Sequence, residues 1–138
     1  MYKIVVGIDE NEERARTCAR AVADLPGPPA ERTVWLLHSF RDNPSGASAP
    51  QVRSVREATR VLEEAGIEVE LTESSGDPAA EILDTADEVD ADLIALAGRR
   101  ERSPAGKALF GSTTQAVILD ADRSVLVAGD ADDEATAG

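Results

Sequence analysis

The sequence predicts an α/β fold: a single doubly wound domain with a five-stranded parallel sheet and helices on both of its faces. Short apolar runs alternate along the chain with segments in which apolar residues recur at helical spacing. Turn-forming residues separate the two kinds of segment, and the helical segments have the roughly 10 to 15 residues typical of crossovers between parallel strands. The length of 138 residues suits one domain.

The first part of the chain predicts two strands, a helix and a loop. The first apolar run, KIVVGI, spans residues 3–8. The next segment, NEERARTCARAVADL (11–25), carries apolar residues at helical spacing. A second apolar run, RTVWLLHSF (32–40), precedes RDNPSGASAP (41–50), whose proline and glycine steps mark a loop.

The middle of the chain predicts a second helix and a third strand. The segment QVRSVREATRVLEEAG (51–66) has helical periodicity, and Gly66 closes it at the C-terminal end. The segment IEVELTE (67–73) alternates apolar and polar residues, which is typical of an edge or half-buried strand.

The last part predicts a third helix and two more strands. The helix GDPAAEILDTADEV (76–89) begins with Asp77 as its N-cap and Pro78 at its first position, which is a strong start signal. The runs ADLIALAG (91–98) and RSVLVAG (123–129) are the fourth and fifth strands. Five strands joined by helices imply right-handed crossovers and a parallel sheet.

Charge is the most unusual bulk property of the chain. There are 27 acidic and 14 basic residues, and the net charge is -13. This excess disfavours binding to nucleic acid and to anionic membranes. The only lysines are Lys3 and Lys107. An acidic, lysine-poor surface resembles that of proteins from salt-loving organisms, so we expect a halophilic protein whose folding depends on salt.

The chain carries no pattern of a membrane span or of a signal peptide, so we expect a cytoplasmic protein. Residues 1–129 form the expected domain. Residues 130–138, DADDEATAG, form an acidic tail with nothing to bury, and we expect it to be disordered. The single cysteine, Cys18, lies on the apolar stripe of the first predicted helix and is expected to be a packed thiol.

The carboxyl ends of the strands are the expected place for a ligand, because doubly wound sheets bind there. Asp9, His38, Ser39 and Gly98 lie at these ends, although Asp9 could equally cap the first helix. His38 is the only histidine, which excludes a catalytic dyad or metal cluster built on histidine, and we expect it to be packed. We expect a solvated face for a group of carboxylates that resembles metal ligands only by number, namely Asp84, Asp87, Glu88, Asp90 and Asp92.

The stretch GRRERSPAGKALFGSTTQAV (98–117) follows the fourth strand. It is not a P-loop, because Glu101 and Ala108 stand where that motif needs glycine and a hydroxyl residue. The first strand is also not followed by the glycine pattern of a dinucleotide fold. Gly111 and Ser112 open a predicted helix whose N–H groups can receive a phosphate. The alternative is a capping box, S-x-x-Q from Ser112 to Gln115, which needs no ligand.

Five segments of the chain resemble the universal stress protein family: KIVVGID, LLH, GDPAAEIL, ADLIALAGRR and ALFGSTTQAV. The resemblance extends from Met1 to about Gly129. The resemblance implies a homodimer that pairs through the last strand, Ser124 to Ala128. It also implies, in one subclass, ATP held between strands one and four, with or without Mg²⁺. The residues at the matching positions are Gly7, Ile8, Asp9, Ser39, Ala97, Gly98, Arg100, Gly111, Ser112, Thr113 and Thr114.

Nucleotide-binding members of that family are similar in having G-x2-G-x9-G-[ST], and this chain departs from the pattern at one glycine. Gly98, Gly111 and Ser112 match, but Glu101 replaces the middle glycine and adds bulk and negative charge. The arginines on either side favour phosphate. Two functions therefore stay open: an adenine nucleotide-binding stress-response protein, and a ligand-free dimeric regulatory module. No residue is placed as a base, so slow ATP hydrolysis is the most that enzymatic activity could amount to.

Overall fold

The computed structural model describes residues 1–9, 11–39, 53–74, 76–97, 100–102 and 108–129. Within these residues a five-stranded sheet has the order β3-β2-β1-β4-β7, and every neighbouring pair is parallel. The doubly wound α/β prediction is therefore confirmed. The strands are β1 (Tyr2–Ile8), β2 (Arg32–Ser39), β3 (Glu68–Ser74), β4 (Leu93–Ala97) and β7 (Ser124–Ala128).

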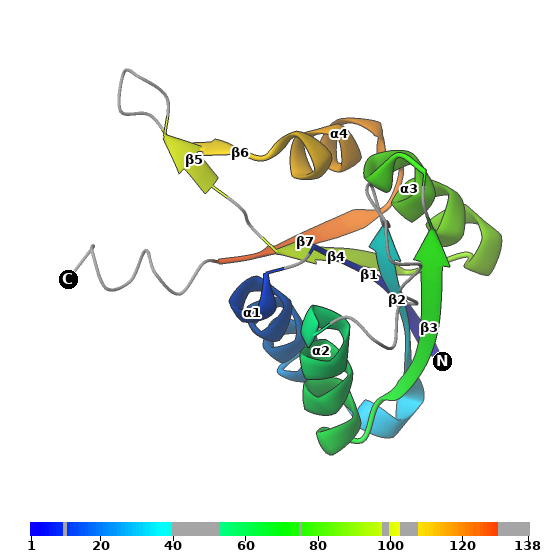
Figure 1. Cartoon of the computed structure of the whole chain (residues 1–138). Helices are drawn as coiled ribbons and strands as arrows, with labels where there is room; N and C mark the ends of the chain where they lie inside the picture. Colours follow the sequence, from blue (N-terminus) through cyan, green and yellow to red (C-terminus); the bar gives the residue numbers. More distant parts are fainter. Residues whose placement is uncertain (10, 40–52, 75, 98–99, 103–107, 130–138) are drawn as a thin grey trace.

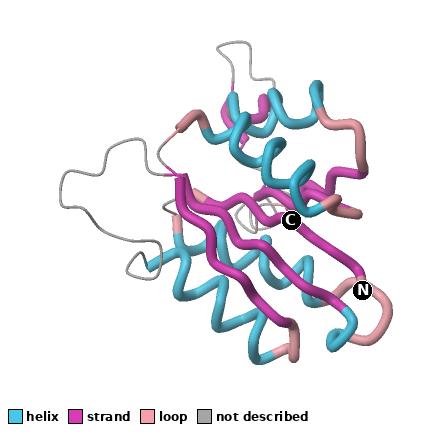
Figure 2. Tube along the Cα trace, turned by 90° about the vertical axis from the view of Figure 1, so that its right-hand side faces the viewer, coloured by secondary structure: helices cyan, strands magenta, loops and turns pink. Residues whose placement is uncertain are grey.

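Two helices cover each face of the sheet, as Figures 1 and 2 show. On one face lie α1 (Glu12–Ala23) and α2 (Arg53–Glu64), and on the other lie α3 (Pro78–Val89) and α4 (Ser112–Asp120). A short 3₁₀ helix, Pro29–Glu31, precedes β2. The predicted loop 41–50 and the tail 130–138 lie outside the described residues.

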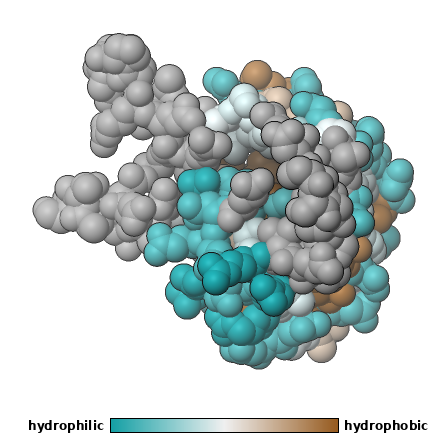
Figure 3. All heavy atoms as spheres, in the orientation of Figure 1, coloured by the Kyte–Doolittle hydropathy of each residue, from teal (hydrophilic) through white to brown (hydrophobic). Residues whose placement is uncertain are grey.

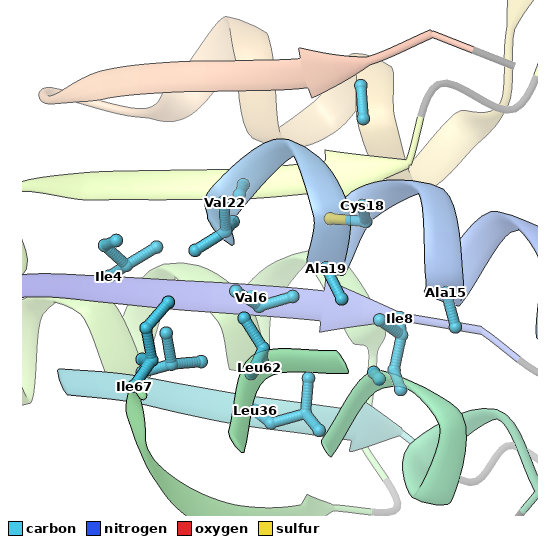
Figure 4. Close-up of a cluster of buried hydrophobic side chains, with 14 of the residues drawn as sticks. Ile4, Val6, Ile8, Ala15, Cys18, Ala19, Val22, Leu36, Leu62 and Ile67 are labelled. Atoms are coloured by element: carbon cyan, nitrogen blue, oxygen red, sulfur yellow. The ribbon is translucent and has the colours of Figure 1, made fainter. Parts of the chain in front are cut away.

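The sheet positions its helices because side chains alternate along each strand. Ile4, Val6 and Ile8 of β1 face α1 and α2 (Figure 4), whereas Val5 packs in the cluster under α3 and α4. Cys18 of α1 is fully buried in the first cluster, and burial raises the pKa of its thiol to about 12. The prediction of a packed thiol is confirmed.

Local signals for helix ends agree with the structure. The Asp77 side chain accepts a hydrogen bond from the N–H of Ala80 at 3.1 Å, and Pro78 is the first residue of α3. Gly66 follows α2 with φ of 88°, the left-handed conformation that glycine adopts easily. Asp90 closes α3 with φ of 56°, and it is the only non-glycine residue with positive φ in the described part of the chain.

Two arginines donate hydrogen bonds to the C-terminal ends of α1 and α3. Arg32, at the start of β2, is buried and donates hydrogen bonds to the carbonyls that close α1 and its loop: Val22, Ala23, Leu25, Pro26 and Gly27. Arg123, just before β7, donates to the carbonyls of Ala86 and Ala91, each at 2.8 Å. Each guanidinium thus adds a charged donor to carbonyls at a helix C-terminus, including those of Val22 and Ala86, which also accept backbone N–H groups.

Between β4 and α4 the chain forms a hairpin that the sequence did not predict. Strands β5 (Arg100–Arg102) and β6 (Ala108–Phe110) pair antiparallel in a separate two-stranded sheet, with Glu101 opposite Leu109. Figure 1 shows it beyond the carboxyl edge of the main sheet. The residue that departs from the glycine pattern therefore lies in extended, paired backbone.

Hydrophilic residues cover much of the described surface over α1 and α2 in Figure 3, as the acidic composition predicts. Among the described residues, no helix combines the length and the apolar character that crossing a membrane requires.

Candidate functional site

A cavity of about 330 Å³ lies at the carboxyl edge of the sheet, where β1 and β4 end. This is the position at which a parallel sheet of this order leaves a crevice, because the crossovers leave β1 and β4 toward opposite faces. Its volume is within the range of small-molecule sites. Residues from β1, α1, β2, α3, β4 and α4 line it: Gly7, Ile8, Asp9, Asn11, Arg14, Leu37, Pro78, Ile82, Leu96, Ala97, Gly111, Ser112, Thr113 and Thr114.

Asp9 and Arg14 form an ion pair on the wall of the cavity. Arg14 Nε and Nη2 lie 3.2 and 2.9 Å from Asp9 Oδ2, and the backbone N–H of Asn11 donates to Asp9 Oδ1 at 2.9 Å. Asn11 is the N-cap of α1, and its side chain accepts from the N–H of Arg14 at 2.8 Å. The alternative in which Asp9 is the N-cap of the helix is therefore wrong, because Asn11 occupies that position and Asp9 accepts instead from the N–H of Asn11 and from the Arg14 side chain.

Another part of the cavity lining is apolar and closely packed. A Cβ atom on Gly7 would lie 2.5 Å from Ile82 Cδ1 and 3.1 Å from Leu96 Cδ2. Glycine at this position allows α3 to approach β1 and contributes bare backbone to the cavity wall. Leu37 and Pro78 extend the same apolar surface.

The first turn of α4 forms the polar end of the cavity. Gly111 is the N-cap, with no side-chain hydrogen bond at the cap, and Ser112 is the first helical residue. The predicted capping box is wrong, because it needs Ser112 at the N-cap position and Gln115 three residues later in the helix. The first-turn N–H groups have no acceptor within the helix, and the hydroxyl residues Ser112, Thr113 and Thr114 of the same turn line the cavity. The Thr114 hydroxyl donates to the Ala97 carbonyl over a long 3.5 Å.

The sequence and the fold of the chain match a known family. The model of the universal stress protein family matches residues 1–129. The chain belongs to the universal stress protein family.

Several individual members of this family are similar to the chain in sequence or in structure. A universal stress protein of Mycolicibacterium smegmatis is 36% identical over 66 residues, which cover 47% of this chain and 50% of that protein. The match thus spans half the length of that relative. A universal stress protein of Archaeoglobus fulgidus, solved in complex with dAMP, is 26% identical with a TM-score of 0.67, covering 93% of this chain and 98% of that one. A universal stress protein solved in complex with cAMP is 25% identical with a TM-score of 0.72, covering 94% and 98%.

Most of the site residues expected from the family resemblance line the cavity of this universal stress protein. They come from β1, β4 and α4: Gly7, Ile8, Asp9, Ala97, Gly111, Ser112, Thr113 and Thr114. Gly98 lies outside the described residues, and so do the side chains of Ser39 and Arg100, although Ser39 ends β2 and Arg100 begins β5. His38 is buried at the end of β2, as expected.

The sequence interpretation missed part of the cavity lining: Asn11, Arg14, Leu37, Pro78, Ile82 and Leu96. A signal for two of these residues was present. Asn11, shortly after the end of β1, is a residue type that commonly caps a helix, and this cap places Arg14 in the first turn of α1. The apolar residues of β2 and α3 carry no such signal, because their periodicity shows only that they are buried.

No carboxylate group of the cavity is arranged as a metal site. Among the described residues there is no cluster of three or more histidine, cysteine, aspartate or glutamate side chains that could hold a metal ion. The acidic residues of α3 and the following loop do not gather in space: Arg123 Nη2 pairs with Asp87 at 2.8 Å, and Asp92 accepts from the N–H of Lys3 at 2.9 Å.

Proposed function

We propose that this universal stress protein binds an adenine nucleotide in the cavity between β1 and β4. One observation carries the proposal: a carboxylate, an apolar wall and the start of a helix line a single cavity. Each suits one part of a nucleotide. A carboxylate accepts hydrogen bonds from sugar hydroxyls, apolar side chains cover a base, and helix N–H groups receive a phosphate.

The chemistry of the polar end supports a phosphate in particular. The first turn of α4 contains no acidic residue, and Ser112 is exposed while Thr113 is half-buried beside it. Gly111 and not Ser112 is the N-cap, so the helix does not require the Ser112 hydroxyl as a cap and this hydroxyl can contact a ligand. The relatives solved with dAMP and with cAMP lend the proposal further support.

The proposal extends to ATP as one ligand, with Mg²⁺ bound through its phosphates. Glu101 weighs against ATP, because its charge repels additional phosphates. We expect Glu101→Gly to lower the dissociation constant of ATP about tenfold, which corresponds to about 1.4 kcal/mol of binding free energy. Arg100 and Arg102 flank Glu101 in β5, so the variant leaves their charges in place. If neither form binds ATP at millimolar concentration while AMP binds, the ligand is a monophosphate.

We also propose a homodimer through β7, acting in the cytoplasm. Edge strands need protection, and the two edges of this sheet differ. Exposed Glu68, Glu70 and Glu73 protect β3, whereas β7 presents half-buried valine and leucine residues at Val125–Val127. Pairing of two β7 strands about a twofold axis would cover both edges.

The deciding experiment measures nucleotide in protein purified without added ligand, followed by calorimetry with AMP, cAMP and ATP. The matched variant is Ser112→Ala. Because Ser112 is not the N-cap, the variant should leave the free energy of unfolding within about 0.5 kcal/mol of wild type. The variant should weaken the binding of AMP severalfold, since one hydrogen bond to the phosphate is lost. Absence of binding by wild type at millimolar concentration would favour the ligand-free dimeric regulatory module.

A further inference from the structure

Among the described residues, Arg14 is the one arginine that lines the cavity, and the family resemblance does not assign it a role. It lies in the first turn of α1, where its backbone N–H is fixed by the Asn11 side chain. Its side chain is 22% exposed, compared with 42% for Asp9, so the pair is partly withdrawn from solvent. Solvent screening of these two charges is correspondingly reduced.

The hydrogen bonds of the pair show which acceptor positions of Asp9 and which N–H groups of Arg14 are already occupied. Asp9 Oδ2 accepts from Arg14 Nε and Nη2, and Asp9 Oδ1 accepts from the N–H of Asn11. A carboxylate offers about four lone-pair positions, so one position on Oδ1 is left for a ligand. A guanidinium has five N–H groups, and those of Arg14 that do not donate to Asp9 have no acceptor among the described residues.

The charge of this wall decides which ligands the cavity accepts. Asp9 alone would place a negative charge in a cavity of about 330 Å³ that also receives a phosphate in the proposed function. In so small a cavity the two charges lie within roughly the Debye length, about 8 Å at physiological salt. Arg14 cancels the charge of Asp9 while leaving one of its acceptor positions open.

We propose that Arg14 determines the specificity of the cavity for anionic ligands: it neutralises Asp9, so that a nucleotide is bound in preference to the corresponding uncharged nucleoside. This inference rests on the proposed nucleotide-binding function. It assigns Arg14 a role in choosing the charge of the ligand, separate from the recognition of base or sugar.

The test compares the dissociation constants of AMP and adenosine by calorimetry. In Arg14→Gln the carboxylate of Asp9 loses its counter-charge. The dissociation constant of AMP should therefore rise at least tenfold, and that of adenosine less than threefold. Arg14→Lys keeps the charge and should hold the preference for AMP within threefold of wild type. In the double variant Asp9→Asn, Arg14→Gln the wall is neutral again, and the ratio of the two constants should return to within threefold of wild type.

The matched control is Arg16→Gln. Arg16 lies on the same helix and pairs with Glu57 at 3.2 Å, but it does not line the cavity, so the ratio should stay unchanged. Thermal melting shows whether each variant is folded. Equal weakening of AMP and adenosine in Arg14→Gln would overturn the inference, and so would a double variant that stays as poor for AMP as Arg14→Gln. If wild type binds neither compound, the proposed function fails first and the inference fails with it.

Discussion

Gly7 of β1 lies so close to Ile82 of α3 that a Cβ atom on Gly7 would be 2.5 Å from Ile82 Cδ1. Both residues line the cavity, so this contact fixes the distance of α3 from the sheet at the site itself. The backbone of Gly7 has no unusual φ, and the requirement for glycine comes from the neighbouring side chain.

Gly7→Ala should destabilise the protein by about 1–3 kcal/mol, because the added methyl group overpacks the contact with α3. Denaturant unfolding measures this change. The double variant Gly7→Ala, Ile82→Val removes the Cδ1 atom that the new methyl group meets, and it should recover part of the loss. Additive effects of the two changes would contradict the packing explanation.

Arg32→Ala should cost about 3 kcal/mol or more in the free energy of unfolding, because one buried and several partly buried carbonyls lose a charged donor together. Arg32→Lys should be intermediate, since an ammonium group cannot reach all of these carbonyls at once. Arg20→Ala is the control: Arg20 lies in the last turn of α1 but is exposed. Urea midpoints compare the three, and a loss in Arg20→Ala equal to that in Arg32→Ala would reject the role of the buried guanidinium.

Glu57 should make stability depend on acidic pH. Hydrogen bonds from Arg60 and then from Arg16 lower the pKa of its carboxyl from 4.5 to about 2. Because the pKa is lowered in the folded state, the stabilisation is fully present above pH 4.5 and is lost as the pH falls toward 2. The melting temperature of Glu57→Gln should therefore lie below that of wild type at pH 7, and the gap should narrow between pH 4.5 and 3.

Glu63→Gln is the control for this pH dependence. Glu63 is exposed on the same helix and has no ion-pair partner among the described residues. The melting temperature of Glu63→Gln should stay close to that of wild type across the range. A constant gap between Glu57→Gln and wild type would show that the ion pairs do not cause the effect.

The proposed dimer gives the fourth prediction. Wild type should be a dimer at micromolar concentration in molar KCl by light scattering, and Val127→Lys in β7 should be a monomer, because a charge at the edge opposes strand pairing. Glu70→Lys, on the exposed edge strand β3, should remain a dimer. A monomeric wild type would refute pairing through β7.

The main sheet and its helices could be predicted from sequence because each element carries a local signal. Buried runs marked β1 and β4, alternation marked the edge strand β3, and Asp77 with Pro78 marked the start of α3. The hairpin of β5 and β6 lacked such a signal, because its three-residue strands are too short to show alternation. Gly111 and Ser112 open α4 as predicted, and only the capping-box alternative placed the N-cap one residue late, at Ser112, since glycine caps a helix through its backbone and leaves no side-chain pattern.

The cavity could be predicted only in part for a related reason. Strand ends and the α4 motif pointed to residues near Asp9 and Gly111, because a parallel sheet brings these ends together. The pairing of Asp9 with Arg14 depends on rotamers in the first turn of α1, and the contact of Gly7 with Ile82 depends on how closely α3 approaches β1. Neither distance is expressed in the spacing of residues along the chain.

Arg32 and Arg123 secure the helices at the amino ends of the strands, and the cavity lies at the carboxyl ends. The seven residues of β1, at about 3.3 Å each, keep these regions roughly 20 Å apart. Changes at such separations usually act independently. Evolution can therefore alter the ligand at one end of the domain while the anchors at the other end go on holding the scaffold together, which makes such a fold readily adaptable to new signals.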